Sequence, residues 1–242
     1  KKDHLKIKDI KFSLNNLKFF SNKVVAQIYN GKYYSIKGDI NNDSTNLTEN
    51  EINKFSKNFF IKSNIKKIQF NSKNTFSFKL NKKFKIKDFQ FESTIGMEKF
   101  LILNNFDLKN FFPEVKNEIM FSNNKVKIKY KKNNFNIVGE GMILYQNNED
   151  YISYSLDAID EKFEFKTNLK INENPFVINF LNFKKDSKKK TIINLEGINY
   201  KNKITQINFF SLKEEENIIK IKDLEFDKDL KFKDLNSFEV NF

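Results

Sequence analysis

Four stretches of the chain repeat one short pattern, in which apolar residues alternate with lysines until an aspartate interrupts them. The copies are "LKIKDIKF" (5–12), "FKIKDFQF" (84–91), "IKIKDLEF" (219–226) and the looser "LKFKDLNSF" (230–238). Side chains of a strand alternate between its two faces, yet the apolar residues after each aspartate are out of phase with those before it. An extra residue, absorbed as a β-bulge at the Lys-Asp step, would bring both sets to one face. The pattern predicts bent strands with one apolar face.

The copies are irregularly spaced, which argues against a solenoid with a fixed period. Between them, alternating segments recur at intervals of about ten residues, a spacing typical of antiparallel all-β proteins. They run from "NEIMFSNNKVKIKY" (117–130) to "ITQINFF" (204–210). We therefore predict an all-β fold: an elongated, twisted antiparallel sheet that forms a groove, with one or two short helices, as a single segment over residues 1–242.

Turn-forming residues place the predicted hairpins. Asn30-Gly31, between two β-rich arms, is the strongest short hairpin signal that a sequence carries. Polar residues predict further turns at 72–74, 123–124 and 132–134. The segment "FVINFLNF" (176–183) is predicted as another strand. The lysine-rich residues 184–190 after it are interpreted as a solvated loop or as a contact for lipid headgroups.

Two segments depart from the strand period. Residues 49–60 are predicted as a short amphipathic helix, because Ile52, Phe55 and Phe59 have helical spacing and Thr48 with Glu51 forms a capping box. Residues 97–115 interrupt the alternation, and a turn of helix is predicted just before Pro113.

The charge balance is basic, but it is a weak indication of nucleic-acid binding. The chain has 44 basic and 31 acidic residues, a net charge of +13, and every basic residue is Lys. Arginine supplies the bidentate contacts to phosphate and guanine that nucleic-acid readers favour. The abundance of Asn, Ile, Lys and Phe fits the codon bias of an AT-rich genome. No nucleic-acid partner is expected.

Residues that carry chemistry are scarce. Cysteine is absent, the single histidine is His4, and no Gly-rich phosphate loop is present. Residues 39–50 resemble a calcium loop, but Ser44 replaces the required Gly and Asn50 the bidentate Glu, so a solvated loop is expected instead. We predict a protein that is not an enzyme and has no metal and no cofactor.

The apolar face is the candidate site. The chain has 29 Phe residues, and a face rich in them must close on a second sheet or bind an apolar ligand. Gly139 and Gly141 share this face, where they predict either a bend that lets another element approach or a trough for an acyl chain. The predicted lining residues are Phe84, Ile86, Phe89, Phe91, Ile128, Tyr130, Phe135, Ile137, Gly139, Gly141, Ile143, Tyr145, Ile152, Tyr154, Phe163 and Phe165.

The opposite face has its own candidate feature and leaves alternatives open. Lys125, Lys127, Lys129 and Lys131 share one side of their strand, either as a solvated outer face or as a basic strip for phosphate groups. Two other classes of protein fit the pattern: a closed β-sandwich that serves as a structural or adhesion module, and a basic β domain that binds nucleic acid.

The recurring "IKIKDLEF" strands, the segment "DLKNFFPEVKNEIMFSNNKVKIKY" (107–130) and the following "FNIVGEGMILY" (135–145) resemble the AsmA-like family of the bacterial envelope, the AsmA, TamB and YhdP type. The resemblance is clearest over residues 84–242. It implies a long β-groove, apolar inside, that carries phospholipids from the inner to the outer membrane across the periplasm. It also implies that the ends of the full-length protein contact membranes, and it supplies no catalytic residues.

The longest apolar run, "FLIL" at 100–103, is far shorter than the ~20 residues that a membrane-spanning helix requires. Because the first residue is Lys rather than Met, we expect the chain to be a fragment. The inner-membrane anchor that the resemblance implies would lie outside it.

Overall fold

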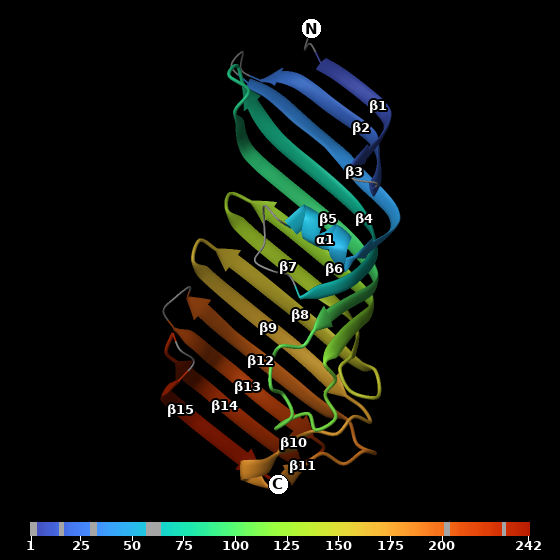
Figure 1. The fold of residues 1–242 in the computed structure, drawn as a ribbon. Coiled ribbons are helices and arrows are strands. Elements are labelled where there is room, and N and C mark those ends of the chain that lie inside the picture. Colours follow the sequence, from blue (N-terminus) through green and yellow to red (C-terminus); the bar gives the residue numbers. More distant parts are fainter. Residues whose placement is uncertain (1–3, 15–16, 30–32, 57–63, 201–203, 229–230) are drawn as a thin grey trace.

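A computed structural model of the chain describes residues 4–14, 17–29, 33–56, 64–200, 204–228 and 231–242. In these ranges thirteen strands form one open antiparallel sheet, and each strand pairs with its neighbours in chain order. Figure 1 shows the sheet twisting along its length, with the two termini at opposite ends. The strands are β1 His4–Leu14, β2 Leu17–Tyr29, β3 Tyr33–Thr48, β4 Ile65–Asn81, β5 Ile86–Leu103, β6 Glu118–Lys131, β7 Asn134–Leu144, β8 Asp150–Ile159, β9 Lys162–Ile171, β12 Thr191–Tyr200, β13 Thr205–Glu214, β14 Asn217–Phe226 and β15 Phe232–Asn241.

The predicted all-β class and antiparallel sheet are confirmed, and the described residues form one large sheet rather than a sandwich of two. The other described strands, β10 (Val177–Ile178) and β11 (Phe183–Lys184), make a two-stranded sheet around the 3-10 turn η1 (Asn179–Leu181). The molecule exposes 16378 Å² of surface for 28.9 kDa, whereas a compact monomer of that mass exposes about 11,400 Å². The excess is what a sheet with one largely uncovered face produces.

Three of the four motif aspartates mark the places where the strands change phase, and Asp234 of the looser fourth copy is not among those with a left-handed backbone. Asp9, Asp88 and Asp223 all have a left-handed backbone, with φ of 52–53°. Around Asp88 the pairing shifts by one residue between β4 and β5. At Asp223 itself, strands β13, β14 and β15 stay in step, and the shift falls between β12 and β13. Strands β14 and β15 shift by one residue further along, between Glu225 and Phe226. Strands β13, β14 and β15 therefore each contain one extra residue at the same level of the sheet. Beyond it, the apolar residues return to the same face, as predicted.

Replacing Asp223 tests the strain at this position. A β-branched residue is disfavoured at positive φ, so Asp223→Val is expected to lower the free energy of unfolding by about 1–2 kcal/mol. Asp223→Asn tolerates the conformation and retains an oxygen and an amide beside Asn236, whose Nδ2 donates to Asp223 Oδ2 over 3.0 Å. Urea denaturation of both variants measures the difference. Equal stability of the two variants would contradict this account.

Two of the predicted hairpins are confirmed and two turns are wrong. Tyr29 pairs with Tyr33 across the Asn30-Gly31 hairpin, whose turn residues lie outside the described part of the chain. Lys132 and Asn133 both have positive φ, 50° and 65°, in the turn between β6 and β7, as a type I′ turn requires. Residues 72–74 and 123–124, in contrast, lie inside β4 and β6. The side chains of Ser72, Asn74 and Asn124 donate hydrogen bonds to residues of neighbouring strands, so these residues have no need of a turn.

The predicted helix is confirmed over α1 (Glu49–Ser56), and the rest of 49–60 lies outside the described residues. The backbone N–H and Oγ1 of Thr48 both donate to Glu51 Oε2, at 2.8 and 2.7 Å, so the predicted capping pair forms. Residues 39–48, expected as a solvated loop, are instead part of β3.

The interruption expected over 97–115 begins only after Leu103, because β5 continues to that residue. Beyond it, N–H groups of Phe111 and Phe112 donate to Leu108 O, which is one helical turn as predicted.

The strand predicted over 176–183 is wrong, because this segment leaves the large sheet. Together with 104–117 it forms what we call the cap, residues 104–117 and 172–190. Val177 N donates to Phe111 O over 3.0 Å, which joins the two cap segments. Figure 1 shows them lying in front of the C-terminal strands.

Candidate functional site

The large sheet has two chemically different faces. The pairing register shows which side chains share a face, because residues directly opposite each other on paired strands point to the same side. The apolar face is the one that carries Ile137, and the polar face is the one that carries Lys127. One row of the apolar face crosses six strands. It consists of Ile128, Ile137, Leu156, Phe165, Gly197 and Ile207.

A second apolar row lies closer to the hairpin turns. It consists of Phe91, Tyr130, Phe135, Ala158 and Phe163. Most of the predicted lining residues fall on these rows or beside them. Phe91, Ile128, Tyr130, Phe135, Ile137, Ile152, Tyr154, Phe163 and Phe165 are all half-buried. The structure thus brings these side chains from β5 to β9 together on one surface.

Three predicted residues lie at the margin of the sheet instead. Phe84, Ile86 and Phe89 are 78%, 60% and 40% exposed. Phe84 is in the turn between β4 and β5, with φ of 57°. The ring of Phe89 lies 5.8 Å from that of Tyr130, so this residue still contacts the apolar rows.

The two glycines do not open a trough. A Cβ on Gly139 would lie 2.4 Å from Tyr154 Cζ, and one on Gly141 would lie 2.5 Å from Asn124 Cγ. The side chains of Tyr154 and Asn124 therefore occupy the space that the glycines leave. The structure supports the other predicted role of the glycines, which is to let neighbouring groups approach the strand closely.

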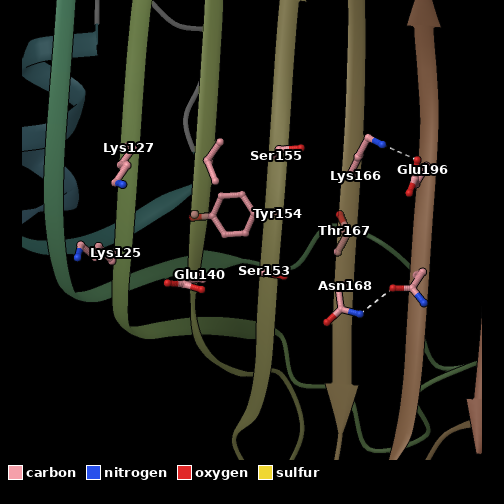
Figure 2. Close-up of a pocket in the computed structure, with 13 residues that line it drawn as sticks. Lys125, Lys127, Glu140, Ser153, Tyr154, Ser155, Lys166, Thr167, Asn168 and Glu196 are labelled. Carbon is pink, nitrogen blue, oxygen red and sulfur yellow. Dashed lines mark hydrogen bonds and ion pairs between the residues drawn. The ribbon is translucent and has the colours of Figure 1, made fainter.

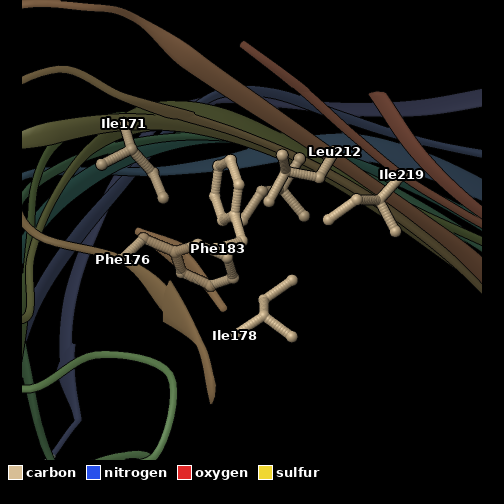
Figure 3. Packing of buried hydrophobic residues seen from close by; sticks show 7 residues of the cluster. Ile171, Phe176, Ile178, Phe183, Leu212 and Ile219 are labelled. Carbon is tan, nitrogen blue, oxygen red and sulfur yellow. The ribbon is translucent and has the colours of Figure 1, made fainter. Parts of the chain in front are cut away.

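The cap covers the C-terminal part of the apolar face. Figure 3 shows its Phe176, Ile178 and Phe183 packed on residues of the sheet. Phe183 also stacks on Phe242, with ring centroids 5.7 Å apart. The sheet residues of this buried cluster are Ile171, Ile193, Leu212 and Ile219. Acyl chains could not reach these four positions without displacing the cap.

Two further predicted residues, Ile143 and Tyr145, are buried at the edge of the cap, 8% and 3% exposed. Tyr145 OH donates to Asp150 Oδ2 over 2.9 Å. Burial, with the charge of Asp150 and this bond, raises the pKa of Tyr145 above its ordinary value. Tyr145 therefore holds the cap region together as a neutral donor and does not line the open surface.

A network of buried polar groups fixes the cap segment 172–190. Asp150 accepts bonds from Asn172 N and Asn174 Nδ2, at 2.8 and 2.7 Å. Lys185 is 4% exposed, and its Nζ donates to Asn172 O and Asp186 O. Burial lowers the pKa of Lys185, although the nearby charges of Glu214 and Asp150 oppose this. Sequence alone placed Lys185 in a solvated or headgroup-binding loop, which is wrong for this residue.

A polar patch interrupts the apolar face over β3, β4 and β5, and the sequence interpretation missed it. Ser93 Oγ donates to Asn74 Oδ1 over 2.6 Å, and Asn74 Nδ2 donates to Ser72 Oγ over 2.7 Å. Ser72 Oγ in turn donates to Asn42 Oδ1. All four residues are buried. Between β6 and β1, the apolar part of this face is therefore smaller than the alternation of apolar and polar residues predicted.

The polar face carries the lysine strip around a shallow hollow of about 420 Å³ (Figure 2). Lys125, Lys127, Lys129 and Lys131 are all exposed on this face, and the first two line the hollow. Register places Glu140 opposite Lys125 and Glu92 opposite Lys129. Lys166 Nζ forms an ion pair with Glu196 Oε2 at 2.7 Å in the same hollow. Opposite charges alternate here, which favours the solvated outer face over a continuous phosphate-binding strip.

A larger hollow, about 830 Å³, lies at the N-terminal end of the sheet, where β2 and β3 separate. Pairing between them ends at Phe20 and Asn41. Strands β1, β2 and β3 and helix α1 all contribute to its wall. None of the predicted lining residues contributes. The sequence contained the apolar residues but no signal that the two strands separate.

Asp39 sits where β2 and β3 begin to separate. Its carboxylate accepts the N–H groups of Asn22 and Lys23, each at 3.0 Å, and Asn41 Nδ2 at 2.6 Å. Partial burial acts to raise the pKa of Asp39, but these hydrogen bonds outweigh it and hold the pKa below its ordinary value. The carboxylate thus accepts hydrogen bonds from two backbone N–H groups of β2 at the place where the pairing with β3 is irregular.

This lowered pKa gives a pH dependence. A carboxylate with a depressed folded-state pKa stabilises the fold above its unfolded pKa, about 3.9, and loses that contribution as pH falls through the folded value. The stability difference between the native chain and Asp39→Asn should therefore be constant above about pH 5 and shrink below about pH 3.9. Urea denaturation across this range measures it. A difference that does not change with acidification would refute the role of Asp39.

Within the described ranges, no group of three or more His, Cys, Asp or Glu residues could hold a metal ion. The helices of the same part of the chain are too short or too polar to cross a membrane. No family model, no curated protein and no solved structure matches the chain. The resemblance to the AsmA-like family therefore stays a prediction.

Proposed function

We propose that the apolar face binds acyl chains of phospholipids and that the protein transfers these lipids between the inner and outer membranes, in support of outer-membrane biogenesis. The observation that carries the proposal is the register of the apolar rows, which align large apolar side chains across β5 to β9. Soluble proteins seldom expose apolar patches beyond a few hundred Å² without a use for them. Transfer needs no catalytic group, only a surface along which chains slide.

The polar face fits this proposal. Its lysines and glutamates keep the back of the sheet in water, so that only one face binds apolar ligands. Membrane anchoring through a segment outside this chain, and a periplasmic location, follow from the family resemblance and belong to the proposal.

The test is to incubate the purified chain with phospholipid vesicles, separate the two, and examine the protein by native mass spectrometry. We expect bound phospholipid. A photoreactive residue in place of Ile137 should form lipid adducts, and one in place of Lys127, on the polar face, should not. Absence of lipid from a folded sample at both positions would reject the proposal.

The nucleic-acid alternative is tested in the same preparation. Binding to single-stranded DNA through lysines would weaken steeply between about 50 and 200 mM salt. We expect no binding at the lower salt concentration. Salt-sensitive binding of DNA without lipid binding would favour the alternative.

A further inference from the structure

The large sheet has two edge strands, β1 and β15, each of which pairs on one side only in the described part of the chain. Figure 1 shows them at opposite ends of the sheet. The outer side of an edge strand presents backbone N–H and C=O groups with which another strand can pair. Natural proteins usually protect such edges with lysines, proline or a covering segment. The two edges of this sheet differ in that protection.

Edge strand β1 is protected by lysines. Lys6, Lys8 and Lys11 are all exposed on it. Asp9 is the only acidic residue of the strand. The charge of Lys23 on β2, followed by that of Lys8, lowers the pKa of Lys6. The lysines of this edge therefore already repel one another, and a second copy of the same edge would add to the repulsion.

Edge strand β15 has little of this protection. It contains no proline, and Lys233 is its only lysine. That lysine forms an ion pair with Glu225 of β14, at 3.1 Å. Glu239 forms another with Lys220 of β14, at 3.3 Å. Every residue of β15 except Ser237 is exposed. The strand thus presents a long, nearly neutral edge, which favours pairing with another strand.

The apolar row that ends at Ile207 continues to this edge. Ile207 is opposite Leu224 of β14, and Leu224 is opposite Leu235 of β15. Leu235 is 37% exposed, and Phe232 and Phe238 are 65% and 43% exposed. Both phenylalanines lie opposite apolar residues of β14, on the same face as Leu235. The apolar face is therefore exposed up to the outermost strand.

The side chains of this strand are nearly symmetrical about Leu235. Phe232 lies three residues before it and Phe238 three residues after it. Lys231 and Glu239, both exposed, lie four residues before and after it. If two copies run antiparallel about Leu235, each Phe232 is opposite a Phe238, and each Lys231 is opposite a Glu239. Aromatic pairs and pairs of opposite charge both stabilise neighbouring strands. A shift of the centre by one residue would place apolar side chains opposite polar ones.

Strand direction favours pairing of β15 with itself over pairing with β1. Thirteen strands alternate in direction, so β1 and β15 run the same way. A second copy with its apolar face on the same side would therefore offer β1 as a parallel strand, which pairs slightly less stably per residue. The same copy, turned about an axis normal to the sheet, offers β15 as an antiparallel strand.

We propose that β15 pairs with β15 of a second copy of this chain, antiparallel and centred on Leu235, in a two-fold symmetric dimer. Two-fold dimers with one self-complementary patch are the commonest homo-oligomers. In this dimer the apolar rows of the two copies meet at Leu235, so the two apolar faces form one continuous surface. The dimer goes beyond the proposed function and requires no lipid.

A single cysteine tests the centre of the pairing, because the chain has no cysteine of its own. Leu235→Cys should give a disulfide-linked dimer under mild oxidation, since residues opposite each other have Cα atoms about 4.5–5.5 Å apart, within reach of a disulfide. Phe238→Cys is the matched control on the same strand and face. Its two cysteines would lie six residues apart along the strands, about 20 Å. Equal cross-linking of the two variants, or none at position 235, would overturn the proposed pairing.

Charge exchange tests the register by mass. Analytical ultracentrifugation of the native chain over a concentration series should show a species of twice 28.9 kDa. Glu239→Lys and Lys231→Glu each place like charges opposite each other, and each should raise the dissociation constant of the dimer about tenfold. A mixture of the two variants should dimerise like the native chain, because opposite charges then face each other at both positions. A mixture as weak as either variant alone would refute the register.

Lysine substitutions distinguish the two edges. Leu235→Lys places two lysines opposite each other at the centre and should raise the dissociation constant more than tenfold. Ile7→Lys, on β1 and 47% exposed, should dimerise like the native chain. Both variants should keep the circular dichroism of the native chain. A dimer weakened by Ile7→Lys and not by Leu235→Lys would place the interface at β1 and overturn the inference, as would a native chain that stays monomeric.

Discussion

Ile137→Asp is expected to reduce phospholipid binding by more than tenfold. Ile137 is half-buried in the middle of the apolar row, paired with Ile128 on one side and Leu156 on the other. A carboxylate there would lie between two apolar side chains and must be desolvated when an acyl chain covers it. The same change should lower the free energy of unfolding by about 1–3 kcal/mol, as an unpaired charge in apolar surroundings does.

The neighbouring residue supplies the control. Val138 lies on the polar face, 46% exposed and directly opposite Lys127. Val138→Asp introduces the same carboxylate into the same strand, one residue away, beside a lysine. Lipid binding, measured by native mass spectrometry after incubation with vesicles, should be retained by Val138→Asp. If both variants bind lipid like the native chain, the apolar face is not the lipid surface.

Phe176→Ala should cause the largest loss of stability among single truncations of the cap. Phe176 is 3% exposed, and its ring lies 5.2 Å from Phe112 and 6.5 Å from Phe183. Removing a buried phenylalanine ring costs about 3–5 kcal/mol through lost transfer energy and the cavity that remains. In a chain of this length, the melting temperature would fall by about 6–20 °C.

Phe180 is the matched control for this change. It belongs to the same cap segment, in η1, but is 76% exposed, so Phe180→Ala should leave the melting temperature nearly unchanged. Calorimetry measures both variants. Hydrogen exchange over 104–117 and 172–190 shows whether the loss is confined to the cap, as expected for a locally stabilised unit. Similar melting temperatures of the two variants would mean that the cap does not stabilise the sheet.

The sequence predicted the strands and their faces well, because alternation is a local property. Ile137 and Val138 point to opposite faces whatever the rest of the chain does, and only one of the two faces is apolar. The phase change at Asp223 was also readable, since aspartate tolerates the left-handed backbone of a bulge better than most residues.

The predicted turns were wrong where polar residues lie in the interior of a strand. Ser72, Asn74 and Asn124 are turn formers by type, and turns were predicted at them. In the structure their side chains bond across neighbouring strands, or to carbonyl groups as Asn124 Nδ2 does with Ser122 O and Met142 O. Turn propensity reflects bonding to the local backbone, and partners from distant strands replace it.

By itself the sequence determined an antiparallel sheet with one apolar and one polar face, because both depend on alternation and on turns between neighbouring strands. Only the tertiary structure decided which parts of that face are open. It placed residues 172–190 over the C-terminal strands, filled the space at Gly139 with Tyr154, and separated β2 from β3 beside Ser21. Each of these outcomes depends on contacts between segments far apart in the chain, and alternation carries no information about them.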